Sequence, residues 1–191
     1  MKTFKEYYEE QEIIEEGFEN IGNMIGKVLG IGASGVLTAW VAALIVKGGV
    51  GVVNSFANTF GKAKAINFKR NFKEASKDSP SVKDQINKSE ELKKQYAEFI
   101  DPILDKIKEK NWEEAATVYN ELPIDKKNST EIRRIIIEAV ISETKTIPIS
   151  EPTPGNECYR AIKAIMGLAT AKAISKAIQE QATKYIQEKG V

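Results

Sequence analysis

The sequence predicts an all-α protein, in which a glycine-rich apolar helix or helical hairpin is followed by a small helical bundle and a long C-terminal amphipathic helix. Three observations predict this fold class. Nineteen consecutive uncharged residues occupy positions 28–46, apolar residues recur at helical spacing through the second half of the chain, and capping residues precede several of these segments. With 191 residues, 42% of them hydrophobic and 29% charged, the chain can form one or two small domains with a core.

Shifts in composition divide the chain into five parts. Residues 1–16 form an acidic amphipathic helix, and residues 17–78 form a glycine-rich apolar region with a basic flank. Residues 79–146 read as a soluble helical domain, residues 147–155 as a proline-rich linker, and residues 156–191 as a basic amphipathic helix.

The uncharged run 28–46 is long enough to cross a bilayer core as a helix, and Lys27 and Lys47 bound it. Small residues also recur every four positions, which places them on one side of a helix as a glycine zipper. They are Gly22, Gly26, Gly30, Ser34, Thr38 and Ala42. Such a strip lets two helix backbones approach closely, either in a membrane or in the core of a soluble homo-oligomer. Glycines at positions 48, 49 and 51 predict the end of this helix, and a second, less apolar arm from Asn54 would complete a hairpin.

Charge is strongly segregated. Residues 1–16 contain two lysines and six glutamates, whereas residues 47–75 contain six cations and one glutamate. Five of these cations lie in a basic helical stretch and are candidate contacts for DNA phosphates or lipid headgroups, or form a solvated face. They are Lys62, Lys64, Lys69, Arg70 and Lys73. If the apolar run spans a membrane, the excess of cations predicts a cytoplasmic location for this side.

Four helices are expected in residues 79–146. Their predicted starts are Ser79 with Pro80, Asp101 with Pro102, Asn111 with Glu114, and Asn128 with Glu131. The first should end near Ile100 and the third at Pro123. The fourth carries apolar residues around more than one face, namely Ile132, Ile135, Ile136, Ile137, Ala139, Val140 and Ile141. We therefore expect this helix to be buried on most of its circumference, within the domain or against a partner subunit.

The C-terminal part follows a linker with prolines at positions 148, 152 and 154, and Asn156 is expected to cap one helix that runs to about Lys189. Its cations are Arg160, Lys163, Lys172, Lys176, Lys184 and Lys189. A basic helix of this kind lies on a membrane, binds DNA phosphates or packs in a bundle. Cys158, at the start of the helix, is expected to be a small packing residue.

Several classes of enzyme and metal site are excluded by composition. Histidine is absent and Cys158 is the single cysteine, so an intrachain disulfide, a His/Cys zinc site and a His-containing catalytic triad cannot form. The sequence also lacks a glycine-rich phosphate loop after a strand and a metal-ligand motif. We therefore expect a protein that is not an enzyme and has no catalytic residue, cofactor or metal.

The N-terminal segment carries a resemblance to a known family. Its sequence MKTFKEYYEEQ begins with Met-Lys-Thr and an aromatic residue, and Thr3 with Glu6 forms a capping box at the start of an acidic amphipathic helix. It resembles the capsid-targeting leaders of internal head proteins of T-even-type tailed phages. Ile14, Glu16 and Gly17 then match the family's prohead-protease site, which implies cleavage between Glu16 and Gly17. The resemblance covers about residues 1–17.

Two interpretations of this segment remain open. Residues 1–16 are either a capsid-targeting leader or an amphipathic helix that packs on its own protein. The cleavage pattern also occurs at residues 136–139, within an expected helix that a protease could not bind as an extended substrate.

Three functions are compatible with these features. The first is a phage virion protein that is packaged inside the head with other virion proteins and DNA, and whose apolar helix serves assembly or enters a host membrane on delivery. The second is a single-span host-membrane effector or pore component with a cytoplasmic helical domain. The third is a structural adaptor subunit of the capsid, neck or tail.

Overall fold

The computed structural model describes residues 43–44, 80–148 and 156–189, with side chains up to Ile178. Seven helices and no strand make up this part of the chain, which confirms the all-α class. The proposed processing site, the small-residue strip from Gly22 to Ala42 and the five basic candidates from Lys62 to Lys73 lie outside the described residues. The structure therefore reports on the bundle and on one short piece of the apolar run.

Helix α4 (Pro80–Gln95) begins at the predicted proline, and α5 (Ala97–Lys108) follows after a break at Tyr96. The prediction of a break at Asp101 and Pro102 is wrong, because Pro102 lies inside α5. Proline in a helix interior removes one backbone hydrogen bond. Three fully buried isoleucines of α5, Ile100, Ile103 and Ile107, outweigh this loss, since each contributes about 1.5–3 kcal/mol on burial.

Helix α6 (Trp112–Glu121) has the predicted cap, with the side chain of Asn111 accepting a hydrogen bond from the backbone N–H of Glu114 at 3.2 Å. Pro123 follows its end as expected. A short helix that the sequence analysis did not anticipate, α7 (Ile124–Lys127), then leads into the next long helix. The hydroxyl of Tyr119 donates to the backbone oxygen of Lys127 at 2.9 Å and ties this turn to α6.

Helix α8 (Thr130–Thr144) begins one residue later than predicted. Ser129, and not Asn128, is the N-cap, because its hydroxyl accepts from the N–H of Ile132 at 3.3 Å. The side chain of Asn128 accepts instead from the guanidinium group of Arg133 at 3.1 Å. The hydrogen bond with Arg133, five residues along the chain, thus engages the side chain that was expected to cap the helix.

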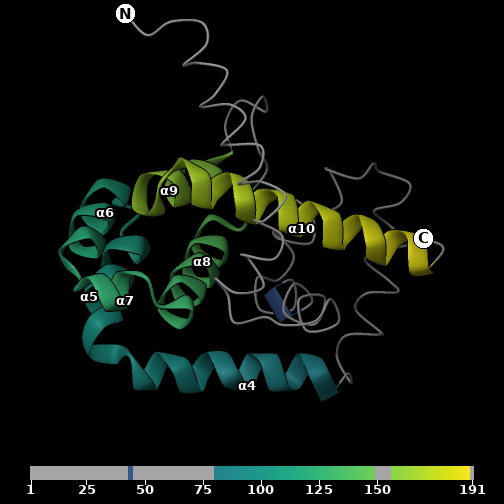
Figure 1. Cartoon of the computed structure of the whole chain (residues 1–191), viewed down its shortest axis with the longest axis horizontal. Coiled ribbons are helices and arrows are strands. Elements are labelled where there is room, and N and C mark those ends of the chain that lie inside the picture. Colours follow the sequence, from purple (N-terminus) through teal and green to yellow (C-terminus); the bar gives the residue numbers. More distant parts are fainter. Residues whose placement is uncertain (1–42, 45–79, 149–155, 190–191) are drawn as a thin grey trace, which may run out of the picture.

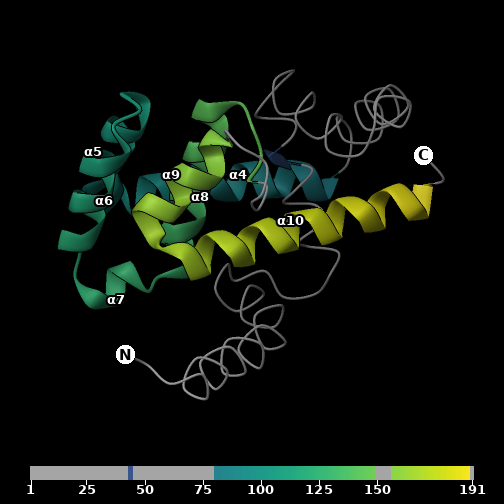
Figure 2. The ribbon, with the colours of Figure 1, turned by 90° about the horizontal axis from the view of Figure 1, so that it is seen from above.

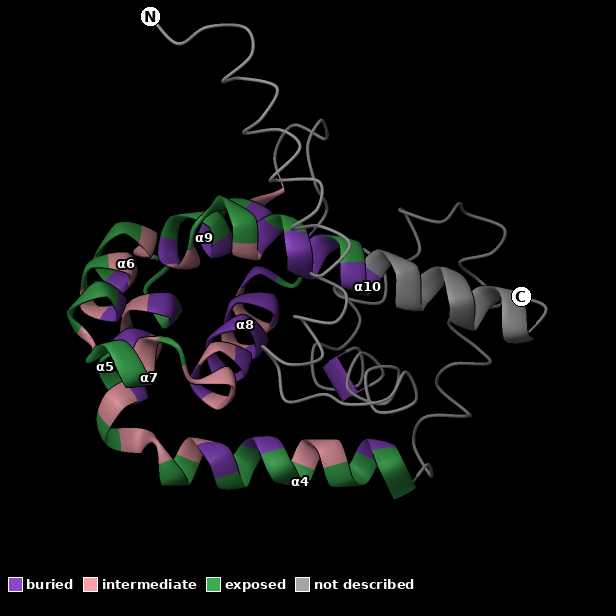
Figure 3. Cartoon of the chain, in the orientation of Figure 1, coloured by how far each residue is buried: buried purple, intermediate pink, exposed green. Residues whose placement is uncertain are grey.

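The prediction that α8 is buried around most of its circumference is confirmed. Nine of its 15 residues are buried, and five of these are isoleucines. They pack inside the bundle, so that the described structure uses the isoleucine-rich helix as its own core (Figure 3).

The expected single C-terminal helix is two helices, α9 (Glu157–Met166) and α10 (Leu168–Lys189). Asn156 caps α9 as predicted, accepting from the N–H of Tyr159 at 2.7 Å. The helix ends at Gly167, whose φ of +90° and ψ of 164° lie in a region that side-chain-bearing residues rarely adopt. The prediction of one continuous helix is therefore wrong, because Gly167 permits a change of direction after α9.

The helices are arranged around α8. Helices α4, α5, α7 and α9 all contact α8, while α6 packs against both α5 and α9. Figures 1 and 2 show α5, α6 and α7 gathered at one end of the molecule, and α4 and α10 extending toward the other end. The core thus forms where isoleucine side chains of α5 and α9 pack against those of the central helix, α8.

Candidate functional site

A charged pair lies inside the central helix, among its isoleucines. Arg134 Nε is 2.9 Å from Glu138 Oε1, one helical turn away, and the two side chains are 2% and 6% exposed. Charged residues are rarely buried to this degree unless they are paired. The spacing of four residues brings them together on one face of α8, which turns toward α4.

Ser89 of α4 completes this polar cluster. Its hydroxyl lies 2.8 Å from Glu138 Oε1 and accepts from the guanidinium group of Arg134 at 3.1 Å. Arg134 also donates to the backbone oxygen of Gln85 at 3.3 Å. The contacts join two helices whose cluster residues are 45 and 49 positions apart in sequence. We call these four residues the α4–α8 polar cluster.

This cluster was not among the sites predicted from the sequence. Arg134 and Glu138 could have been noticed as an i, i+4 pair of opposite charge inside an isoleucine-rich helix. Ser89 gave no comparable signal, because it is one small polar residue on a largely polar helix. Its role depends on which face of α4 meets α8.

A groove of about 370 Å³ lies beside the cluster, between α4, α5 and α8. Its apolar lining comes from Leu104, Ile107, Ala139 and Ile141, together with Leu44. Glu138 also reaches the groove, and further charged lining residues are Glu90, Lys93, Lys108 and Glu143. The groove therefore combines an apolar interior with polar edges.

Leu44 and its neighbour Ala43 belong to the uncharged run 28–46. Both are helical and buried, with exposed fractions of 5% and 4%, and both form part of the hydrophobic core cluster of the bundle. In Figure 1 this short piece lies between α4 and α10, near α8. At least this part of the apolar run is thus in contact with protein.

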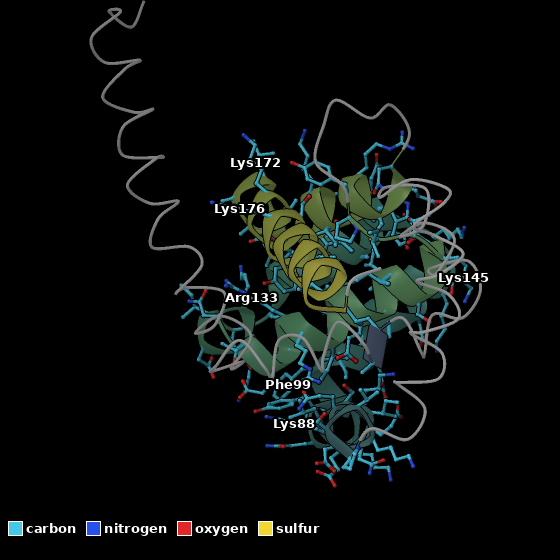
Figure 4. All side chains as sticks on the ribbon, turned by 90° about the vertical axis from the view of Figure 1, so that its right-hand side faces the viewer. Lys88, Phe99, Arg133, Lys145, Lys172 and Lys176 are labelled. Atoms are coloured by element: carbon cyan, nitrogen blue, oxygen red, sulfur yellow. The ribbon has the colours of Figure 1, made fainter. Side chains whose placement is uncertain are left out.

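A basic surface follows α9 and the described side chains of α10. The exposed cations are Arg160 and Lys163 on α9, and Lys172 and Lys176 on α10. Glu157 is the only acidic residue among positions 157–178, and it lies 3.7 Å from Lys110. Figure 4 shows Lys172 and Lys176 on the outer side of α10. We call the four exposed cations the α9–α10 basic surface.

Cys158, in the first turn of α9, is fully buried, as the packing role predicted for it requires. Burial raises the pKa of its thiol to about 12, and a hydrogen bond with the Thr144 side chain opposes this shift only in part. The thiolate is the reactive form of cysteine, so this residue is inert at neutral pH.

The second match to the cleavage pattern, at residues 136–139, lies within α8. Ile136 and Glu138 of this match are both buried. A protease that needs an extended substrate has no access to it in the folded chain, as the sequence analysis expected.

Among the described residues, no group of acidic or cysteine side chains is arranged to hold a metal ion. In the same part of the chain, no helix has the length and apolar character needed to cross a membrane. Comparison of the whole chain with known families, curated proteins and solved structures finds no match.

Proposed function

We propose that this chain is a non-enzymatic protein of a tailed-phage virion, packaged inside the head through residues 1–16. The observation that carries the proposal is the leader-like segment MKTFKEYYEEQ with a cleavage pattern at Ile14, Glu16 and Gly17 directly after it. Removal of residues 1–16 would delete six glutamates and leave a more basic protein. Such a chain is suited to lie beside packed DNA.

The buried position of Ala43 and Leu44 supports this proposal over a single-span membrane effector. Leu44, two residues before the end of the uncharged run, lines a groove with residues of α4, α5 and α8. We infer that this end of the apolar run serves assembly.

The α9–α10 basic surface supports contact with packaged DNA. Its cations are exposed on two consecutive helices, and Glu157 is the single acidic residue among positions 157–178. Lysine and arginine side chains bind DNA phosphates without reading sequence, which suits a protein that lies among densely packed DNA.

The experiment that tests the proposal transfers the leader to a reporter. Residues 1–20 are fused to a fluorescent protein that is produced during infection by a T-even-type phage. We expect purified heads to contain the reporter with Gly17 as its first residue, as read by mass spectrometry. A Glu16→Gln fusion should be packaged but remain uncut, because the recognition carboxylate is lost. Packaging no better than that of a fusion with a scrambled leader would refute the proposal.

A further inference from the structure

The charges of the bundle are sorted by helix. Residues 97–121, which cover α5 and α6, contain seven acidic and three basic side chains. Residues 157–178, which cover α9 and the described side chains of α10, contain four basic side chains and one acidic. Charges of one sign that gather on a surface raise the local potential and attract a partner of the opposite sign. The molecule therefore carries two regions of opposite charge on different helices.

Part of the charge of α5 and α6 is neutralised within the chain. Lys106 Nζ lies 3.2 Å from the carboxylate of Glu109 and 2.7 Å from that of Glu114, and Lys108 Nζ lies 2.8 Å from that of Asp105. The remaining carboxylates of these two helices are exposed and form no ion pair with another described residue. They are Glu98, Asp101, Glu113 and Glu121. We call these four residues the α5–α6 acidic surface.

The acidic surface and the α9–α10 basic surface do not neutralise each other within one molecule. Among the described residues, the ion pair that joins the two regions runs in the opposite sense, from Lys110 to Glu157 at 3.7 Å. Arg160, Lys163 and Lys172 are exposed and form no ion pair with a described residue. Figure 1 shows α10 extending away from the end of the molecule that holds α5 and α6. These cations and carboxylates can meet only between copies.

An exposed large apolar side chain accompanies each charged region. Leu168, at the start of α10, is 45% exposed, and Ile124 on α7 is 77% exposed. Figures 1 and 2 show α7 at the same end of the molecule as α5 and α6. The two lysines after Ile124 turn back onto the bundle, because Lys126 Nζ lies 5.0 Å from the centre of the Phe99 ring and Lys127 Nζ donates to a backbone oxygen of α6 at 2.9 Å. Protein interfaces combine apolar contact with a polar rim, and both regions offer these two components.

We propose that the α9–α10 basic surface of one copy binds the α5–α6 acidic surface of a second copy. The contact is heterologous, so it leaves the acidic surface of the first copy and the basic surface of the second free for further neighbours. Exposed ion pairs are individually weak and are screened by salt. The assembly therefore forms best at high protein concentration and low ionic strength. DNA phosphates compete with the acidic surface for the same cations.

Isotope-coded cross-linking tests this contact in the full chain. Unlabelled protein is mixed with an equal amount of protein labelled with heavy nitrogen, and a carbodiimide joins lysine amines to carboxylates that lie in ion-pair contact. We expect peptides of mixed isotope composition that join Lys163 or Lys172 to a carboxylate of the acidic surface. Absence of these peptides at low salt, or mixed-isotope links confined to other residue pairs, would overturn the proposal and leave DNA phosphates as the partner of the basic surface.

Matched neutral substitutions measure how much these charges contribute to association. Lys163→Gln with Lys172→Gln removes two cations of the basic surface, and Glu98→Gln with Glu121→Gln removes two carboxylates of the acidic surface. We expect each double variant to lower the association constant, measured by sedimentation equilibrium, by ~5-fold or more. The control is Lys88→Gln with Lys94→Gln, which removes two exposed cations of α4 outside both surfaces and should leave the constant nearly unchanged. An equal effect of all three variants, or no effect of any, would overturn the proposal.

A mixture of the two defective variants shows whether the two surfaces bind each other. The lysine variant keeps its acidic surface, and the glutamate variant keeps its basic surface. We therefore expect the equimolar mixture to associate more strongly than either variant alone, because each supplies the surface that the other has lost. A mixture that associates no better than its separate components would overturn the proposal.

Discussion

Arg134 Nε and Glu138 Oε1 lie 2.9 Å apart inside α8, where both side chains are almost completely buried. A buried ion pair is weak evidence for stability, because desolvation of two charges offsets much of their attraction. What this pair has in addition is a set of hydrogen bonds to α4. We therefore interpret it as a device that fixes how α4 sits on the bundle.

Glu138→Gln should lower the free energy of unfolding by about 3–5 kcal/mol, because it leaves the Arg134 cation buried beside a neutral amide. The measurement is urea unfolding followed by circular dichroism. Asp105→Asn is the matched control, since Asp105 forms an exposed pair with Lys108 at 2.8 Å and its loss should change stability little.

The double variant Arg134→Met with Glu138→Leu distinguishes the contribution of the ion pair to stability from that of side-chain packing. It removes both charges and retains most of the side-chain volume, so we expect a smaller loss of stability than in Glu138→Gln alone. If the double variant loses as much as the single one, the cluster stabilises the bundle through its charges, contrary to our interpretation.

The carboxylate of Glu131 should make the stability of the bundle fall at acid pH. The hydroxyl of Thr130 donates to its carboxylate at 2.8 Å and, together with Ser129, lowers its pKa in the folded chain below the ordinary value of 4.5. A lowered folded-state pKa stabilises the protein above the unfolded-state pKa, and this contribution is lost as pH falls through the folded-state pKa. The urea midpoint of Glu131→Gln should therefore fall less than that of the unmodified chain between about pH 5 and pH 3. Parallel curves for the two proteins would contradict this assignment.

Gly167→Ala should destabilise the junction of α9 and α10. A Cβ at this position would meet no atom within 4 Å, so the expected strain comes from the backbone φ of +90° and not from crowding. Residues other than glycine pay about 1–3 kcal/mol in such a conformation. Thermal unfolding measures the loss of stability. The control is Ala164→Gly, which makes the reverse substitution at an exposed position inside α9. Unchanged stability of Gly167→Ala would show that the two helices can join into one.

Charge reversal on the basic surface tests the proposed contact with DNA. Lys172→Glu with Lys176→Glu should weaken binding to a random-sequence duplex and reduce the slope of log affinity against log salt by about 2, since each phosphate contact contributes about 0.9. The control reverses Lys83 and Lys94, two exposed lysines of α4, and should retain a steeper slope. Equal slopes for the two double variants would locate DNA binding elsewhere.

Local sequence signals predicted much of the bundle. Pro80, Asn111 and Asn156 mark helix starts where the pattern places them, because proline at a first position and asparagine at a cap act on the backbone within one turn. The burial of α8 was also predictable, since isoleucines on more than one face leave no side suited to water.

Three predictions of where helices begin and end failed, each for a different reason. Pro102 stays inside α5 because the isoleucines around it are buried in the core. Asn128 turns toward Arg133 and leaves the cap to Ser129. Gly167 divides the last helix, although the apolar spacing on both sides continues the same helical pattern.

The sequence by itself determined the all-helical class, the starts of α4, α6 and α9, and the identity of the core-forming helix, because these depend on contacts within one or two turns. The pairing of Ser89 with Glu138 and the position of Leu44 against α4, α5 and α8 were decided only by the tertiary structure. Both join residues separated by tens of positions. Such contacts depend on which helix faces meet after the bundle has packed, and no local pattern specifies that choice.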